Sequence, residues 1–517
     1  MALEIVRRIR GNGNESIDIS ELENAVLEHP FVQRLRRIKQ LAFLHYVFPG
    51  ATHTRFEHSL GVLHLSGVAW KRLQDNQSRL YRALVRYGDY AAIERKGHKD
   101  ALVHGLLAPS FNLIEPIFSS DYLFQTLRLA ALLHDLGHPP FSHSGERFLP
   151  SWQSVASGLD AAPSYLRDYV GAKIEALKGD GGDPSKQRVR HEIFSMLMIA
   201  RVLDDTYRRY PKLALKPDPR DVIALIGGPA PLETSPLKQL NALDFMRELI
   251  SGELDIDRMD YLIRDSRECG VVYGIFDAGR ILDSLCLYYD PSDHKLHAAI
   301  SFSGLAAFED YLRARHSMYL QLYFHKTAVA AEAMMQHLAE RLRGWELPAD
   351  VDGYAAVDEY NVCDVLRAEA RGMLPAQEAA EVERLVSDLI NDRCLWKRIF
   401  EISGRGALHE AEPTLERAEA FLTAQGQVHN SIFSGTSLTR FRPRGHNELS
   451  RNYLRVVKKD EQQFPRVVPI EDLSPLIAAG DRSYIYRIYA PSDHSTAGGP
   501  RSHSIRDELV AHLRDEP

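Results

Sequence analysis

The sequence predicts a mainly α-helical fold with a small β component towards the C-terminus. Apolar residues recur at three- and four-residue steps through most of the chain, which is the spacing of one face of a helix. Alternating apolar and polar residues, the pattern of a half-buried strand, are rare. Of the 517 residues, 44% are hydrophobic and 26% are charged. This composition is typical of a globular protein and excludes a chain that is disordered throughout and a low-complexity fibre.

The predicted helices follow the apolar spacing along the chain. The first covers residues 20–45, and the turn-forming residues 47–50 (VFPG) end it. The next covers residues 55–74. A strongly apolar helix over residues 121–136 ends at Gly137, which two prolines follow closely. Further helices are expected at residues 191–203, 237–250, 277–287 and 304–342.

Two segments predict β structure. Residues 284–302 alternate around a central turn and are expected to form one hairpin, and residues 484–489 (YIYRIY) are expected to form a late strand. Loops or insertions are expected where the sequence is polar or rich in Gly, Ser and Pro, at residues 85–116, 171–190 and 490–503.

The overall charge argues against a globally basic nucleic-acid binder, because the chain has 63 basic and 70 acidic residues. The basic run at residues 34–39 (RLRRIK) is either a solvated helix face or a local site for a nucleotide effector or single-stranded nucleic acid. The four cysteines are scattered and form no CxxC pair, which argues against a disulfide scaffold and a thiolate zinc site. No apolar run approaches the roughly 18 residues of a membrane span, and the start lacks an apolar signal core. We therefore expect a cytoplasmic protein without a membrane partner.

The strongest chemical signal lies in residues 132–143 (LLHDLGHPPFSH). A His-Asp pair at the end of an apolar helix is costly unless its polar groups have partners. A divalent cation satisfies both groups, because imidazole nitrogen and carboxylate oxygen suit Mn, Fe, Zn or Ni. The helix stop leaves His138 and His143 at the rim of the same site. A structural histidine with a capping aspartate is the alternative, and it is favoured for a lone His-Asp pair.

Two further segments support the metal interpretation. His58 lies in the helical pattern of residues 55–61 (RFEHSLG) and could supply a ligand from a second helix; the alternative is a buried core histidine. Asp257 and Asp260 interrupt apolar residues in segment 254–265, where the alternative is a solvated helix face.

Three ordered motifs resemble those of the HD-domain deoxynucleoside triphosphate (dNTP) triphosphohydrolases. They are residues 55–61, residues 134–143 (HDLGHPPFSH) and residues 257–265 (DRMDYLIRD). The bacterial dGTPases belong to this family. The chain looks more similar to the animal branch, whose members carry a sterile-alpha-motif domain before the HD domain, because residues 31–41 and 46–51 also resemble that branch. We expect no counterpart of the sterile-alpha-motif domain within the given sequence, because the matching residues lie close to its start.

The resemblance implies an HD-domain helical fold with a small mixed α/β C-terminal lobe. It is dense over residues 25–145 and 250–330 and extends thinly to about residue 490. The expected parts are an N-terminal segment 1–24, an HD core 25–345 with insertions near 75–116 and 150–188, a C-terminal lobe 346–490 and a mobile tail 491–517.

The resemblance also implies a metal-dependent hydrolase that cleaves a dNTP to deoxynucleoside and inorganic triphosphate. The implied ligands of a divalent ion (Mn, Fe, Mg, Zn, Co or Ni) are His58, His134, Asp135 and Asp257. This set leaves a coordination position open for water, as catalysis requires. The implied catalytic residues are His138, His143, Glu146 and His191, with His143 as the acid–base histidine near the leaving 5′-oxygen. His138 would contact either a phosphate or a second metal ion.

The implied substrate contacts are Gln40, Leu41, Arg55, Arg258, Tyr261, Asp265, Arg315, Tyr319 and Tyr323. Taken alone, Gln40, Arg315 and Tyr323 would be interpreted as ordinary helix-face or core residues. The three arginines would bind the triphosphate, since a guanidinium bonds phosphate oxygens bidentately. The sugar contacts would be Gln40, Tyr261 and Asp265, which read the 3′-hydroxyl. The ring of Tyr323 would close against the 2′ face and leave no space for a ribose hydroxyl.

Several features depart from the pattern of the animal branch. Glu146 stands where that branch has aspartate, and Glu28 stands where an aspartate would read guanine. The intervals from His58 to His134 and from His143 to His191 are also long, which predicts insertions at the rim. A nucleotide effector is therefore an open expectation. The family resemblance further implies a homo-oligomer (dimer, tetramer or hexamer).

Two other functions stay open from the sequence. One is an HD phosphohydrolase that acts on another nucleotide or phosphate ester, because a fold does not determine a substrate. The other is a nucleotide-sensing module that binds single-stranded nucleic acid through the basic run.

Overall fold

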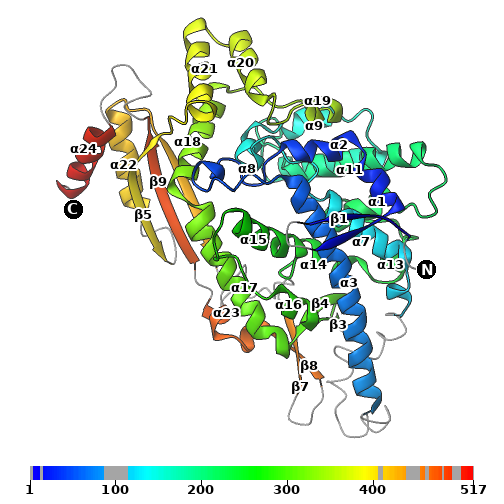
Figure 1. The fold of residues 1–517 in the computed structure, drawn as a ribbon. Coiled ribbons are helices and arrows are strands. Elements are labelled where there is room, and N and C mark those ends of the chain that lie inside the picture. Colours follow the sequence, from blue (N-terminus) through cyan, green and yellow to red (C-terminus); the bar gives the residue numbers. More distant parts are fainter. Residues whose placement is uncertain are drawn as a thin grey trace.

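Helices build the body of the molecule, and small sheets lie at its margins (Figure 1). The computed structural model describes residues 4–11, 15–86, 115–290, 292–405, 412–437, 454–459, 465–479, 482–491 and 502–515. The expected mainly α fold with a small mixed C-terminal lobe is confirmed. No helix in the described parts is both long enough and apolar enough to cross a membrane.

The N-terminal half begins with a hairpin and continues with helices. The hairpin pairs β1 (Ile5–Arg10) with β2 (Ser16–Ser20) antiparallel. The helices are α1 (Glu21–Leu27), α2 (Pro30–Arg34), α3 (Arg55–Arg86), α7 (Asp121–Leu133), α8 (Ser142–Gly145), α9 (Trp152–Ser157), α10 (Ser164–Gly179), α11 (His191–Arg209), α12 (Pro219–Leu225), α13 (Pro236–Gln239) and α14 (Leu243–Ser251).

The second half continues the helical body and then forms the sheets. Its helices are α15 (Ile256–Glu268), α16 (Ala278–Ser284), α17 (Leu305–Met318), the π-helical turn η5 (Tyr319–Tyr323), α18 (Lys326–Arg341), α19 (Val351–Ala355), α20 (Val362–Met373), α21 (Ala376–Ile390), α22 (Glu412–Ala424), α23 (Pro475–Ala479) and α24 (Ser502–Asp515). Its strands are β3 (Leu285–Asp290), β4 (Lys295–Ser301), β5 (Lys397–Arg405), β6 (Asn430–Ser437), β7 (Arg455–Lys459), β8 (Pro465–Pro469) and β9 (Arg482–Ala490).

The sheets confirm both β predictions. Strands β3 and β4 form the expected antiparallel hairpin, and β7 and β8 extend it into a sheet of order β3-β4-β7-β8. The predicted late strand is β9, the centre of the sheet β5-β9-β6. In Figure 1 this sheet lies at one side of the molecule with α22 and α24, and α18 runs between it and the helical body.

The helical core packs α7 against α3 and α15 against α3. Helix α7 is buried on nearly every side from Leu123 to Leu133, which is consistent with its strongly apolar sequence. Its first turn is capped by Ser120, whose hydroxyl accepts from the backbone N–H of Leu123. The end of α7 therefore delivers the His-Asp pair into the middle of the molecule.

Several sequence expectations were wrong. The helix expected at 20–45 is broken, because Pro30 cannot continue α1 and instead begins α2, with His29 as its N-cap. The hairpin β1–β2 within segment 1–24 was not predicted, and it does not conflict with an N-terminal segment of that extent. The loop expected at 171–190 is helical as far as Gly179.

The tail expected to be mobile is in part a packed helix. Helix α24 contacts α22 and β5, and it buries Ile505 and Leu509 in an apolar cluster of its own. Residues 492–501 lie outside the described residues, as do residues 87–114, which hold most of the insertion expected near 75–116.

Candidate active site

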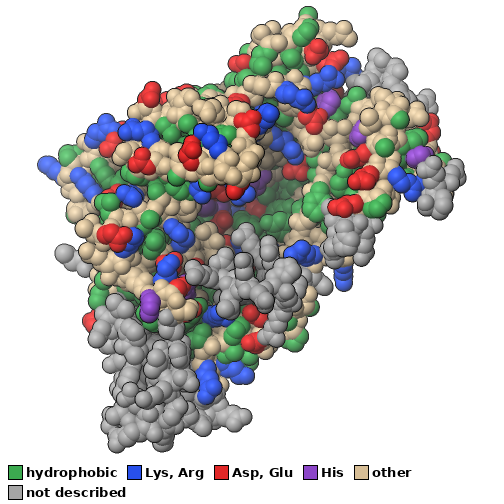
Figure 2. Space-filling view, turned by 180° about the vertical axis from the view of Figure 1, so that it is seen from behind, with side chains coloured by type: hydrophobic (Ala, Val, Ile, Leu, Met, Phe, Trp, Pro, Cys, Tyr) green, Lys and Arg blue, Asp and Glu red, His purple; other side chains and the backbone are tan. Residues whose placement is uncertain are grey.

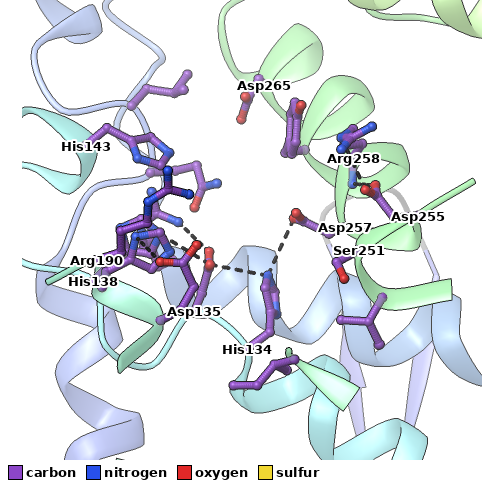
Figure 3. A pocket seen from close by; sticks show the side chains of 18 of the residues that line it. His134, Asp135, His138, His143, Arg190, Ser251, Asp255, Asp257, Arg258 and Asp265 are labelled. Carbon is purple, nitrogen blue, oxygen red and sulfur yellow. Dashed lines mark hydrogen bonds and ion pairs between the residues drawn. The ribbon is translucent and has the colours of Figure 1, made fainter. Parts of the chain in front are cut away.

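Three helices bring four polar side chains together at one point. His58 comes from α3, His134 and Asp135 follow α7, and Asp257 lies in the first turn of α15. The Oδ1 atom of Asp257 lies 2.9 Å from His58 Nε2 and 3.5 Å from His134 Nε2. Asp135 lies on the other side, with Oδ2 3.6 Å from His58 Nε2 and Oδ1 3.4 Å from His134 Nε2. Figure 3 shows His134 between the two carboxylates.

The imidazole rings of His58 and His134 are oriented by contacts of their Nδ1 atoms. His58 Nδ1 lies 2.9 Å from Asp260 Oδ2, and His134 Nδ1 lies 2.9 Å from the backbone carbonyl of Ala131. Both partners accept hydrogen bonds, so each ring donates from Nδ1 and turns Nε2 towards the carboxylates of the cluster. Both Nε2 atoms are buried and lack a hydrogen-bond partner of good geometry among the described residues.

This arrangement fits a divalent metal ion. His58, His134 and Asp135 each offer a ligand atom, and these atoms lie within 4.8 Å of one another. Two imidazole nitrogens with carboxylate oxygens are a donor set for Mn, Fe, Zn or Ni, and the anchoring of Nδ1 is the usual support of a metal-binding histidine. The His/Asp cluster therefore indicates a site for a divalent metal ion, and this donor set does not distinguish among these metals.

The electrostatics of the cluster favour a cation. Burial lowers the pKa of His58, but the neighbouring carboxylates of Asp257 and Asp260 outweigh this effect and raise the pKa to about 10. Burial raises the pKa of Asp257, yet the two histidines beside it hold that pKa well below its usual range. The carboxylates thus stay ionised around buried nitrogens and attract positive charge.

Arg55 makes hydrogen bonds to Asp135 of this cluster and to the neighbouring Ser142. Its Nη1 donates to Asp135 Oδ2, and its Nε donates to Ser142 Oγ at 2.9 Å. The side chain is buried. Arg55 therefore orients Asp135 as well as lining the cavity, which the sequence interpretation did not include.

A second group of titratable side chains follows the helix stop. Glu146 Oε1 lies 2.9 Å from His143 Nδ1 and 2.7 Å from His191 Nδ1. The ring of His138 stacks on that of His191 with centroids 3.6 Å apart. The turn that carries these residues is tight, since Phe141 has φ of 63° and a Cβ on Gly145 would lie 1.9 Å from the carbonyl oxygen of Pro140. His143 is exposed at the rim, whereas His138 is buried.

Both groups border one cavity of about 650 Å³. Figure 2 shows a hollow with histidine side chains at depth on the face turned away from the viewer in Figure 1. The predicted residues that line the cavity are Gln40, Leu41, Arg55, His134, Asp135, His138, His143, His191, Asp257, Arg258, Tyr261, Asp265, Tyr319 and Tyr323. Three predicted residues do not line it, namely His58, Glu146 and Arg315. Of these, His58 contacts the lining residues Asp135 and Asp257, and Glu146 contacts the lining residues His143 and His191.

Buried arginine donors without partners lie on the α15 and α17 side. Arg258 is held by Asp255, with Nε 3.2 Å from Oδ2, but its Nη1 has no hydrogen-bond partner among the described residues. The same holds for Nε and Nη1 of Arg315 and for the hydroxyl of Tyr311. Each unpaired buried donor costs about 1–3 kcal/mol, so an anion that accepts a bond from Arg258, the one of these three residues that lines the cavity, would be stabilised here.

Sequence reasoning missed several residues of the site. The lining residues that it did not name are Arg190, Glu192, Ile226, Ile250, Ser251 and Asp255. It also missed His53, whose Nε2 lies 2.8 Å from Asp265 Oδ1. Asp255 carries a usable signal, because it is an N-cap residue whose side chain accepts from the Arg258 backbone N–H. His53 and Arg190 carry no signal in a single sequence.

The arginines of the basic run at residues 34–39 make contacts with other groups of the same chain. Arg34 is buried and donates to the carbonyl oxygens of Val357 and His138. Arg37 pairs with Asp358, and the guanidinium of Arg36 lies 3.6 Å from the centre of the Phe56 ring. The expectation of a basic face for single-stranded nucleic acid therefore has no support here.

Comparison with known proteins places this site in context. No family model matches the chain. YwfO of Bacillus subtilis, an uncharacterized protein, is 30% identical over 331 residues, which are 64% of this chain and 54% of that protein. The deoxynucleoside triphosphate triphosphohydrolase SAMHD1 of Gallus gallus is 26% identical over 330 residues, which are 62% of this chain and 42% of that protein.

The chain spans about half the length of the curated relatives it matches. A crystal structure of a phosphohydrolase from Bacteroides thetaiotaomicron superposes with a TM-score of 0.56 at 20% identity, covering 94% of this chain and 99% of that one. This likeness shows a shared fold.

Proposed function

We propose that this chain, a homologue of the HD-domain dNTP triphosphohydrolases, is a metal-dependent hydrolase that cleaves a dNTP to a deoxynucleoside and inorganic triphosphate. One observation carries the proposal. A cluster of two histidines and two aspartates lies at the wall of a cavity that also presents Arg258, whose Nη1 has no partner among the described residues. Hydrolysis of a nucleoside triphosphate requires a metal ion that polarises a phosphate and cationic donors that bind the polyanion. The cluster and Arg258 would supply these two functions.

The metal ion would be held by His58, His134, Asp135 and Asp257. When bound, it would polarise the α-phosphate and lower the pKa of a coordinated water. Asp260 and the carbonyl of Ala131 would keep the imidazole lone pairs aimed at it.

His143 would be the general acid. Glu146 accepts from Nδ1 of both His143 and His191, and these bonds hold the pKa of Glu146 well below its usual range although burial opposes them. An ionised Glu146 orients His143, whose other ring nitrogen can face the leaving group. In the reaction, the water oxygen bonds to the α-phosphorus and loses a proton to the solvent, while the bond from phosphorus to the 5′-oxygen breaks. That oxygen takes the proton from His143, which the solvent then restores.

The remaining predicted residues would orient the nucleotide, and all of them except Arg315 line the cavity. Arg258 and Arg315 would bond the phosphates through their unpartnered donors. Asp265 and Gln40 would contact the 3′-hydroxyl, and Tyr323 would close the 2′ face. Arg55, Tyr261, Leu41 and Tyr319 would complete the wall, and His138 would contact phosphate.

Product analysis tests the proposal directly. Purified protein is incubated with Mn²⁺ and each dNTP, singly and as a mixture of the four, and the products are separated by chromatography. Deoxynucleoside and triphosphate should appear, and they should be lost in the variant His134→Ala/Asp135→Ala. The control Asp204→Ala changes an exposed carboxylate of α11 and should keep the activity.

Other outcomes are equally informative. Turnover only in the mixture indicates a nucleotide effector. Release of monophosphate or orthophosphate would replace the proposal with a phosphohydrolase of another type, and intact dNTP under every condition would refute it. Light scattering tests the accompanying proposal of a homo-oligomer (dimer, tetramer or hexamer).

A further inference from the structure

The carboxylate of Asp265 is held at both of its oxygens. Asp265 lies on α15, is only 1% exposed and lines the cavity. Its Oδ1 accepts a hydrogen bond from His53 Nε2 at 2.8 Å, and its Oδ2 accepts one from the hydroxyl of Tyr323 at 2.7 Å. In Figure 3 it lies across the cavity from His134. Such a carboxylate cannot rotate without breaking a buried bond.

His53 acts on Asp265 from behind the cavity wall. The residue precedes α3, its side chain is 3% exposed, and it does not line the cavity. Its Nδ1 is buried without a hydrogen-bond partner among the described residues. The ring therefore makes one strong bond, in which Nε2–H donates to the carboxylate, and that bond sets the orientation of both groups.

The backbone of His53 holds a second cavity residue. Its carbonyl oxygen accepts from the N–H of Gln40 at 3.0 Å, and the adjacent residues Lys39 and Thr54 form a β-bridge. Gln40 lines the cavity, and its Oε1 is buried without a partner among the described residues. One residue thus connects the two polar groups that we assign to the sugar hydroxyl.

Lone pairs remain available on Asp265 for a substrate. Each carboxylate oxygen can accept about two hydrogen bonds, and one position on each oxygen is used by His53 or Tyr323. A hydroxyl that donates to this carboxylate therefore meets an acceptor with a fixed direction. Preorganised acceptors discriminate against ligands that lack the donor, because the buried acceptor is then left unpaired.

We infer that His53 is a positioning residue that locks the Asp265 carboxylate for recognition of the 3′-hydroxyl, and so increases the preference of the site for a nucleotide that has this group. The inference rests on the proposed function. It predicts that the contribution of His53 depends on the substrate, whereas a purely structural residue would affect all substrates alike.

The test compares His53→Leu and His53→Gln with the wild type. Leucine removes the donor, and glutamine restores an N–H near the position of Nε2. Values of kcat/KM are measured for one dNTP and for the 2′,3′-dideoxy nucleotide with the same base. We expect His53→Leu to lower kcat/KM about tenfold on the dNTP and less than about twofold on the dideoxy nucleotide, with His53→Gln recovering part of the loss.

A matched control comes from His45, a half-buried histidine whose Nδ1 contacts the carbonyl oxygen of Ala42 and which does not line the cavity. His45→Leu should leave the ratio of the two kcat/KM values unchanged. Thermal melts followed by circular dichroism establish whether each variant is folded. If His53→Leu is not folded, the comparison is made between His53→Gln and the wild type.

Equal losses on both nucleotides, or no loss on either, would overturn the inference. If the wild type turns over neither nucleotide, the proposed function fails, and calorimetry in EDTA decides about His53 separately. Wild-type protein must then bind the dNTP more tightly than the dideoxy nucleotide, and His53→Leu must reduce that difference. An unchanged or absent difference would again overturn the inference.

Discussion

Replacing Gly61 with alanine should disturb the metal cluster from behind. Gly61 lies on α3 one turn after His58. A Cβ at this position would lie 1.9 Å from Asp260 Oδ1 and 2.2 Å from Arg264 Nη2. These two side chains form a bidentate pair with both bonds at 2.8 Å, and Asp260 also holds His58 Nδ1. The added methyl group therefore needs the space that the pair occupies.

The magnitude follows from two opposing effects. Alanine in place of glycine in a helix interior stabilises by about 0.5–1 kcal/mol. Asp260 and Arg264 are both more than nine-tenths buried, and disrupting a buried ion pair costs about 3–5 kcal/mol. The net loss in the free energy of unfolding should be about 2–4 kcal/mol. Loss of the Nδ1 contact should also weaken metal binding by about 10–100-fold.

Urea unfolding and Mn²⁺ titration measure these effects. Gly171→Ala is the matched control, because Gly171 lies within α10 and a Cβ there would meet nothing within 4 Å. That variant should gain up to about 1 kcal/mol and bind Mn²⁺ as the wild type does. If Gly61→Ala behaves like Gly171→Ala in both measurements, the reasoning about the Asp260–Arg264 pair is wrong.

Three further predictions concern the metal, the cavity rim and pH. Addition of Mn²⁺ after chelation should raise the Tm of the wild type but not of His134→Ala/Asp135→Ala, and an equal rise in both would contradict the metal site. Arg190 is exposed and lines the cavity, and no ion pair joins it to a described carboxylate, so its guanidinium can bind a phosphate of the substrate. Arg190→Gln should therefore raise KM for a dNTP up to about tenfold with kcat little changed, and an unchanged KM would count against this phosphate contact. Burial lowers the pKa of His297, but bonds to Glu248 and Asp293 raise it to about 9. This stabilisation is complete below about pH 6.5 and is lost as pH rises through 9, so the difference in unfolding free energy between wild type and His297→Gln should shrink over that range.

The sequence by itself determined the fold class and the local framework of the site. The apolar run of α7 and its stop at Gly137 place His134 and Asp135 at a helix end, because both signals act within a few residues. The alternation in 284–302 likewise predicted the hairpin β3–β4. Local patterns failed where a single residue interrupts a longer one, as Pro30 does between α1 and α2.

Only the tertiary structure decided which residues stand behind the site. His53 meets Asp265, and Asp260 meets His58, across separations of about 200 residues along the chain. The basic run also depends on the tertiary structure. A series of charges on a helix predicts solvent exposure, whereas Arg34 is buried and donates to two backbone carbonyl oxygens. The physical reason is common to these cases. Periodicity and capping report the contacts of a residue with its neighbours along the chain, but the orientation of a buried polar group depends on partners that only the packed fold brings within hydrogen-bond distance.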